Sequence, residues 1–147
     1  MPDSDDLRKA KEILKKGNYT FVLTKKGQLL KTSYERGILP MLRIIKEDEQ
    51  ALCNAIVADK VIGRAAAFLL IKYRVKAVYA DKISEKAREV LDNNSIFYQF
   101  GESVPFIKNR DQTGQCPLEK LTSHTDNPDY ACEQISLFYK QALGIEL

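Results

Sequence analysis

The chain has 147 residues, 23 of them Lys or Arg and 20 Asp or Glu, which gives a formal net charge of +3. This length predicts one domain, and basic residues spread this evenly do not indicate a nucleic-acid-binding surface. The longest apolar run, residues 65–71, is far short of the ~20 residues that a membrane span needs. Three widely spaced cysteines exclude a disulfide framework. The acidic start, residues 1–6, is unlike a signal or transit peptide, so we expect a cytoplasmic protein.

The first half of the chain predicts a helix, a hairpin and a second helix. Ser4 or Asp5 can cap a first helix of about twelve residues. β-branched and aromatic residues predict strands at 19–24 and 28–32, joined by a turn. The second helix begins near Ile38, because Pro40 fits only in a first turn.

The second half alternates strands and helices. Short apolar runs predict buried strands at 54–58, 74–80 and 96–100. Between and after them we predict helices at 61–73, from a cap at Ser84 to Leu91, from Pro117 and from Pro128. Strands separated by helices of this length imply parallel pairing through right-handed crossovers, with the hairpin as an antiparallel addition. The expected fold is one three-layer α/β/α sandwich over residues 1–147, with a mixed sheet of about five strands.

The segment from Asn109 to Glu119 concentrates reactive side chains just before a helix. Cys116 precedes Pro117, a favourable first helical residue, so its thiol lies where the helix dipole favours a thiolate or a bound anion. Glu119, in the first turn, could cap that helix or face the same cavity. Cys116 is therefore our candidate nucleophile, although a buried thiol in a tight turn is the competing interpretation.

The same segment carries candidate anion-binding residues. Arg110 could hold a carboxylate or phosphate in bidentate fashion, or form a structural salt bridge. Thr113 and Gly114 offer a hydroxyl and open backbone N–H groups, which suits an anion.

A second candidate segment follows the first predicted buried strand. Ligands of such sheets bind beyond the carboxyl ends of the strands, where Asp59 and Lys60 would lie at a helix start. Asp59 suits either a helix N-cap or a functional carboxylate, and Lys60 opposes the dipole and therefore favours an anion. Arg64 could face the same cavity or solvent. Gly63, inside a helix, indicates a close neighbour or ligand, since it costs up to ~1 kcal/mol against Ala.

Residues 58–67 (Ala-Asp-Lys-Val-Ile-Gly-Arg-Ala-Ala-Ala) and 109–119 (Asn-Arg-Asp-Gln-Thr-Gly-Gln-Cys-Pro-Leu-Glu) carry a resemblance to a known family. Their spacing resembles a small family of uncharacterised proteins of unknown function, grouped structurally with the cytidine deaminase-like fold. The resemblance covers about Leu7 to Phe138. It implies a helix-flanked mixed sheet and brings no established activity, substrate or cofactor.

The zinc-ligand pattern of the deaminases is missing from these segments. Zinc deaminases need a His or Cys with a nearby Glu at one helix start, and a Pro-Cys-x-x-Cys pair at the next. Here the first position reads Ala-Asp-Lys at 58–60, and the second has one thiol in Cys-Pro-Leu-Glu at 116–119. His124 suits a surface or packing position, and Cys53 and Cys132 suit small core positions. We therefore predict no metal and no cofactor.

Two functions remain open from the sequence. The first is a metal-independent deaminase-like domain that binds a small anionic or nucleotide-like molecule between Asp59-Lys60 and residues 110–119. Within it, Cys116 could act as a nucleophile with Glu119 or Asp59 as acid and base. The alternative is a non-catalytic interaction or regulatory module, with a vestigial crevice and helix faces that pair with a partner or a second copy of the chain. Neither function involves nucleic acid or a membrane.

Overall fold

The computed structural model describes residues 4–108 and 117–143. The chain forms six helices and five strands over these residues. In order they are α1 (Ser4–Lys16), β1 (Phe21–Lys25), β2 (Gln28–Ser33), α2 (Leu39–Glu47), β3 (Ile56–Ile62), α3 (Arg64–Lys72), β4 (Ala77–Ser84), α4 (Glu85–Asn93), β5 (Phe97–Val104), α5 (Pro117–Thr122) and α6 (Pro128–Leu143).

The five strands form one mixed sheet in the order β2-β1-β3-β4-β5. β1 pairs antiparallel with both β2 and β3. β3, β4 and β5 run parallel, each joined to the next by a helix. The predicted α/β fold with a five-stranded mixed sheet is confirmed.

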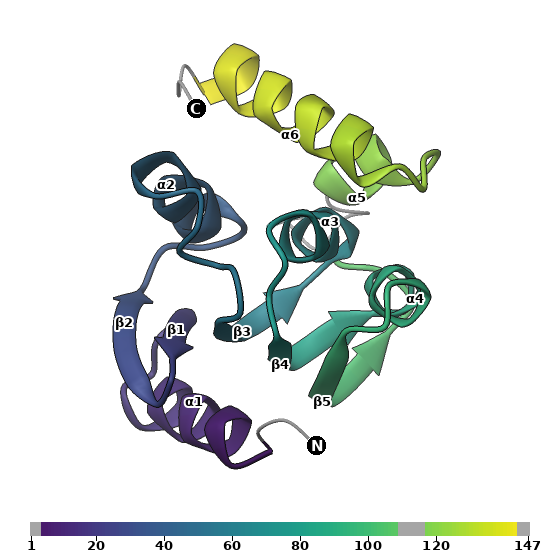
Figure 1. The fold of residues 1–147 in the computed structure, drawn as a ribbon. Coiled ribbons are helices and arrows are strands. Elements are labelled where there is room, and N and C mark those ends of the chain that lie inside the picture. The colour runs from purple at the N-terminus through teal and green to yellow at the C-terminus, as the bar shows by residue number, and fades with distance from the viewer. Residues whose placement is uncertain (1–3, 109–116, 144–147) are drawn as a thin grey trace.

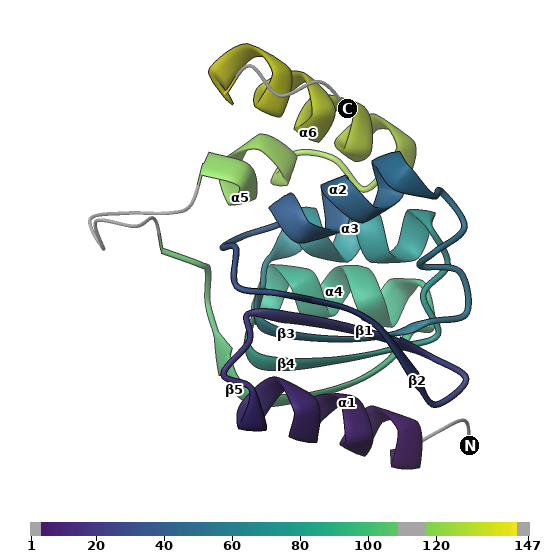
Figure 2. The same ribbon diagram turned by 90° about the vertical axis from the view of Figure 1, so that its left-hand side faces the viewer.

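Helices cover both faces of this sheet (Figure 1). α1 lies on one face, where Leu7, Ala10 and Leu14 pack against buried residues of β3. α2, α3 and α4 lie on the other face, over the larger core. α5 and α6 stack outside α3, as the side view makes clear (Figure 2). The pair α5 and α6 forms a fourth layer beyond the three that the sequence predicts. It covers the outer side of α3, a helix made mostly of apolar residues.

Local sequence signals account for several of the boundaries. The hairpin turns at Lys26 and Gly27, both with positive φ, as a two-residue type I′ turn requires. Pro40 lies in the first turn of α2. Ser84 caps α4, because its Oγ accepts the N–H of Ala87 at 3.0 Å. The cap that the sequence predicts at Ser84 is confirmed.

The predicted boundary between the first buried strand and its helix is wrong. β3 continues to Ile62 and α3 begins at Arg64, so Asp59 and Lys60 belong to the strand and not to a helix start. The β-branched Val61 and Ile62 extend the strand. The carboxylate of Asp59 accepts the N–H of Val61 at 3.3 Å. Its polar pairing is therefore with strand backbone, and it caps no helix.

Candidate functional site

The amino end of α3, at the carboxyl edge of the sheet, is closed by a residue from α5. Gly63 is the N-cap residue and offers no side chain to cap the helix. Glu119 does so instead: its Oε2 accepts the N–H of Arg64 and its Oε1 accepts the N–H of Ile107, both at 3.2 Å. The Glu119 side chain is 2% exposed. The positive end of the helix dipole, a favourable place for an anion, therefore already holds a carboxylate of the chain itself.

Gly63 permits this closure. A Cβ at position 63 would lie 3.1 Å from Oε1 of Glu119 and 3.2 Å from Cγ1 of Ile107, closer than most real Cβ contacts. The prediction that Gly63 lies inside a helix is wrong, because it is the N-cap residue and its backbone is extended. The close approach expected there is present, and the close neighbours are protein side chains. Glu119, which the sequence offered as a cap of its own helix or as a residue facing a cavity, caps the start of α3 instead.

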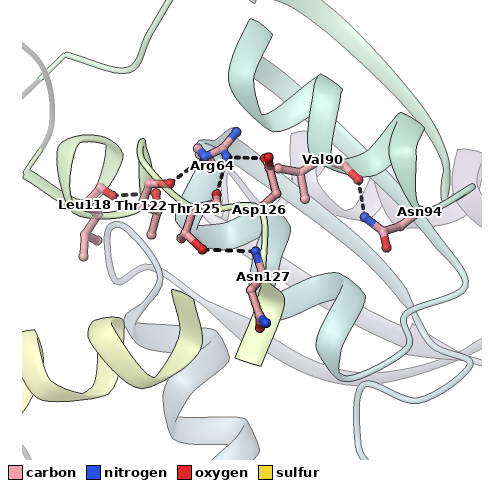
Figure 3. A network of polar contacts seen from close by, with 8 residues as sticks. All are labelled: Arg64, Val90, Asn94, Leu118, Thr122, Thr125, Asp126 and Asn127. Atoms are coloured by element: carbon pink, nitrogen blue, oxygen red, sulfur yellow. Dashed lines mark hydrogen bonds and ion pairs between the residues drawn. The ribbon is translucent and has the colours of Figure 1, made fainter. Parts of the chain in front are cut away.

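Arg64 is buried and ties the connection between α5 and α6 to α3 (Figure 3). Its Nε donates to the carbonyl of Thr122 at 2.7 Å. Its Nη2 donates to the carbonyl of Thr125 and pairs with the exposed Asp126 at 3.0 Å. The guanidinium also lies over the ring of Phe68, 5.0 Å from its centroid. The sequence analysis expected the Arg64 side chain to face either a cavity or solvent. In the structure it is buried and links α3 to the connection between α5 and α6.

Asp59 is a buried carboxylate without a cationic partner among the described residues. Its side chain is 5% exposed, and none of the ion pairs formed by residues 4–108 and 117–143 includes it. Burial raises the pKa of Asp59 well above its ordinary value, and the charge of Asp81 raises it further, while the N–H groups of Val61 and Lys60 oppose the shift. The physical result is a carboxyl group that favours its neutral form.

Lys60 joins the sheet to the end of α1. Its Nζ donates to Oδ1 of Asn18 at 2.9 Å, and its backbone N–H donates to the carbonyl of Thr20 at 3.0 Å. Because Lys60 does not lie in a helix, the dipole argument for an anion beside it no longer applies. Its predicted role in ligand binding now depends on its position at the carboxyl edge of β3 alone.

The remaining candidates divide into described and undescribed residues. Cys132 is buried, and that burial raises the pKa of its thiol to about 12, while Cys53 is half-buried. His124 is exposed and meets the ring of Tyr130 edge-on. The other four predicted site residues lie outside the described part of the chain, so their roles stay predictions: Arg110, Thr113, Gly114 and Cys116.

Two hollows of the described surface are lined by none of the predicted site residues. The first, here the hairpin hollow, has a volume of about 460 Å³ and is lined by Asp6, Lys9, Glu12, Ile13, Lys16, Gly17, Tyr19, Thr24 and Gly27. The second, here the basic hollow, has a volume of about 490 Å³ and is lined by Asp6, Lys25, Lys26, Asn54, Ile56 and Lys76. Sequence reasoning missed both, because each joins segments that come together only through the strand register and the packing of α1 on the sheet.

Two further searches cover residues 4–108 and 117–143 only. Within them, no three His, Cys, Asp or Glu side chains gather closely enough to hold a metal ion. Within the same ranges, no helix has the length and apolar character to cross a membrane.

Comparisons with known proteins agree with this fold. The structure is similar to the crystal structure of a DUF1893 family protein, TM1506, from Thermotoga maritima, with a TM-score of 0.85 and 25% sequence identity over 92% of this chain and 90% of that one. No match was found among curated proteins. Residues 9–139 match the family described as TM1506, a domain of unknown function (DUF1893). The chain therefore belongs to the TM1506 (DUF1893) family.

Proposed function

We propose that this domain is a non-catalytic interaction module and that a partner binds at the edge strand β2. The observation that carries the proposal is the exposed apolar surface there. Leu29 and Leu30 of β2 are 50% and 44% exposed, and Tyr34, just after the strand, is 67% exposed. By contrast, the described part of the carboxyl edge is occupied by Glu119 and Arg64, which are buried and bonded within the chain.

The exposed side chains border the hairpin hollow. Leu29 pairs across the hairpin with Thr24, which lines that hollow together with Tyr19. The ring of Tyr34 lies 5.0 Å from the ring of Tyr19, and its hydroxyl donates to the carbonyl of Gly17. Leu29 and Tyr34 therefore adjoin the hairpin hollow, and Leu29 belongs to a hairpin whose backbone pairing is complete at Thr24 and Lys25.

The partner that fits this surface is an extended, acidic and partly apolar segment of another protein. Such a segment can add a strand to an open sheet edge through backbone hydrogen bonds. Lys9 and Lys16 line the hairpin hollow, beside Asp6 and Glu12. Lys26 and Lys31 lie in the hairpin turn and in β2. Lys31 pairs with Glu47 at 3.6 Å with both side chains exposed, so a partner carboxylate could replace Glu47 at little cost. Lys31 in β2 and the register shift in the β1–β2 pair also disfavour pairing of this edge strand with unrelated strands.

Synthetic peptides test this proposal. An eight-residue peptide that alternates Val with Glu should bind the full chain, and one that alternates Val with Lys should not. The double variant Leu29→Asp/Leu30→Asp should weaken binding of the Val-Glu peptide at least tenfold, measured by isothermal titration calorimetry. Leu137→Asp, at a residue of α6 that is 43% exposed, is the matched control and should bind normally. Equal binding by the hairpin variant, or by the Val-Lys peptide, would contradict the proposal.

A second function, binding of a small anionic or nucleotide-like molecule at the carboxyl edge, has one observation in its favour. The N–H of Ile107 donates to Glu119, so the two flanks of residues 109–116 meet at the start of α3. In this proposal Arg110, Thr113 and Gly114 bind the anion together with Lys60. Cys116 is a nucleophile with Glu119 or Asp59 as acid and base, no metal takes part, and the protein is cytoplasmic.

Alkylation kinetics test the second function within a single sample. Iodoacetamide near neutral pH should label Cys116 fast if its thiol is activated. Cys132 is the internal control and should label slowly, because burial raises the pKa of its thiol to about 12. Inorganic phosphate should slow the labelling of Cys116 if an anion binds beside it. A Cys116 as slow as Cys132 would contradict catalysis by Cys116.

A further inference from the structure

The basic hollow lies at the amino edge of the sheet, opposite the edge to which the sequence points. The strand register explains why its lysines converge. Lys25 ends β1, which pairs with β3, and Lys76 precedes β4 and donates its N–H to the carbonyl of Ala55 at 2.8 Å. Two strand spacings of ~4.8 Å therefore separate the backbones of Lys25 and Lys76. Long lysine side chains can span that gap and reach one bound group.

The lining is rich in lysine. It includes three lysines, at positions 25, 26 and 76, and one carboxylate, that of Asp6. Lys25 donates from its Nζ to the carbonyl of Gln50 at 3.3 Å, which uses one of the three donors of an ammonium group. That bond holds the side chain in place and leaves donors for a ligand.

The lining residues Asn54 and Asp6 add selectivity. Asn54 is exposed and has a positive φ of 59°, a conformation that asparagine tolerates better than most residues; its side-chain amide can both donate and accept. The Asp6 carboxylate accepts hydrogen bonds only, so it suits a hydroxyl of the ligand better than a second anionic group.

We propose that the basic hollow is a binding site for a small hydroxylated phosphate ester, of the sugar-phosphate class. Lysines at separate positions suit the several oxygens of a phosphate, which they bind as point charges. The volume of about 490 Å³ falls within the usual range for small-molecule sites. This site shares Asp6 with the hairpin hollow, and Lys26 also lies beside the proposed partner surface, whereas Lys25, Asn54 and Lys76 line only the basic hollow. The proposal does not depend on either proposed function.

The test is a titration of the 15N-labelled full chain at constant ionic strength, with ribose 5-phosphate, inorganic phosphate and ribose as probes. Ribose 5-phosphate should shift the amide signals of residues 25–27, 54–56 and 76, and leave those around Gly63 unmoved. Inorganic phosphate should shift the same signals with lower affinity, and ribose alone should shift none. Shifts spread evenly over lysines of the whole surface would overturn the proposal.

Variants separate the site from general electrostatic attraction. Lys25→Ala/Lys26→Ala should weaken ribose 5-phosphate binding at least tenfold. Lys82→Ala/Lys86→Ala, two exposed lysines of β4 and α4, removes the same charge elsewhere and should change the affinity less than twofold. Equal losses in the two double variants would overturn the proposal.

Asp6→Asn tests the ligand class. The substitution should strengthen binding of inorganic phosphate, because it removes a negative charge. It should also lower the ratio of the affinity for ribose 5-phosphate to the affinity for inorganic phosphate. An unchanged preference would overturn the assignment of a hydroxylated ligand. Lys26 lies in an exposed turn and Asp6 in the first turn of α1, so both variants should fold, which the dispersion of the same spectra checks.

Discussion

The two crossover units β3–α3 and β4–α4 are aligned by the strand register, yet their helices begin in different ways. Ile62 pairs with Ile83, so the N-cap residues Gly63 and Ser84 occupy matching positions. Ser84 caps α4 with its own hydroxyl. α3 has no local cap and takes its cap from Glu119, 55 residues beyond Arg64. One helix start is therefore independent of the rest of the chain, and the other needs the α5–α6 layer in place.

The same alignment sets Asp59 against Ala80. Both positions are buried, but only β3 places a carboxyl group there. Arg64 likewise follows Gly63 where Glu85 follows Ser84, and only Arg64 is buried and bonded to distant backbone. The β3–α3 unit thus holds two buried charged groups, those of Asp59 and Arg64, and the Arg64 side chain depends on tertiary contacts for its hydrogen bonds. In the β4–α4 unit, the Ser84 hydroxyl caps the helix start from within the same unit. Mutations in the α5–α6 layer should therefore affect the start of α3 and not that of α4.

The largest expected effect is that of Arg64→Ala. The variant leaves the carbonyls of Thr122 and Thr125 without their charged donor, and two such bonds at about 1.5 kcal/mol each predict a loss of roughly 3 kcal/mol. Denaturant unfolding measures it. Asp126→Ala is the control and should cost less than about 0.5 kcal/mol, because Asp126 is 93% exposed. Similar losses for the two variants would mean that Arg64 does not link α3 to the connection between α5 and α6.

Glu119→Ala should come next, at roughly 2 kcal/mol, because the N–H groups of Arg64 and Ile107 lose their acceptor and the helix dipole loses its anion. Glu119→Gln keeps one acceptor oxygen and should lose about half as much. Hydrogen exchange gives a local measurement: the two amides should exchange faster in the Ala variant, while the amide of Ala87 under the Ser84 cap is unchanged. Faster exchange at all three amides would indicate general destabilisation instead.

These dependencies explain which parts of the structure could be predicted from the sequence. The fold class, the hairpin and the Ser84 cap rest on periodicity, turn residues and local hydrogen bonds, all of which a single sequence displays. The start of α3 could not be placed, because its cap comes from Glu119 and no local pattern contains it. Val61 and Ile62 suit either a strand or a helix by composition, and the pairing of β3 with β4 decides for the strand.

The sequence identified individual residues of the candidate site where their position relative to a predicted helix was unusual, but it did not show how they contact one another. Glu119 and Gly63 were both singled out, and both lie at the start of α3. Their relation, a glycine that makes room for a carboxylate, requires coordinates. The basic hollow was missed for a similar reason, since only the strand register places Lys25 and Lys76 on either side of β3 at the same edge of the sheet.

Asp59→Asn should change the pH dependence of stability. Burial raises the pKa of Asp59 in the folded chain above its ordinary value of 3.8, so the folded state binds a proton that the unfolded state has lost. The free energy of unfolding should therefore fall as pH rises from about 4 through the folded pKa, and level off above it. The Asn variant should lack this fall. Urea unfolding of both proteins at intervals from pH 4 to pH 9 measures the difference, and parallel curves would contradict a raised pKa.

The smallest effect tests whether the two helix starts are interchangeable. Ser84→Ala removes a local cap and should cost about 1 kcal/mol.

Gly63→Ser adds a hydroxyl at the matching position, where the backbone is extended (φ −103°, ψ −177°) and suits a capping residue. With Glu119 present, the new Cβ would crowd Oε1 at 3.1 Å and destabilise the chain. In the Glu119→Ala background the oxygen is gone and serine can accept the free amides of α3, so Gly63→Ser should recover up to about 1 kcal/mol. The sign of the serine effect should therefore reverse between the two backgrounds in a double-mutant cycle. If serine destabilises both by the same amount, Ile107 and not Glu119 sets the space at Gly63, and the α3 start cannot be converted to the local type of α4.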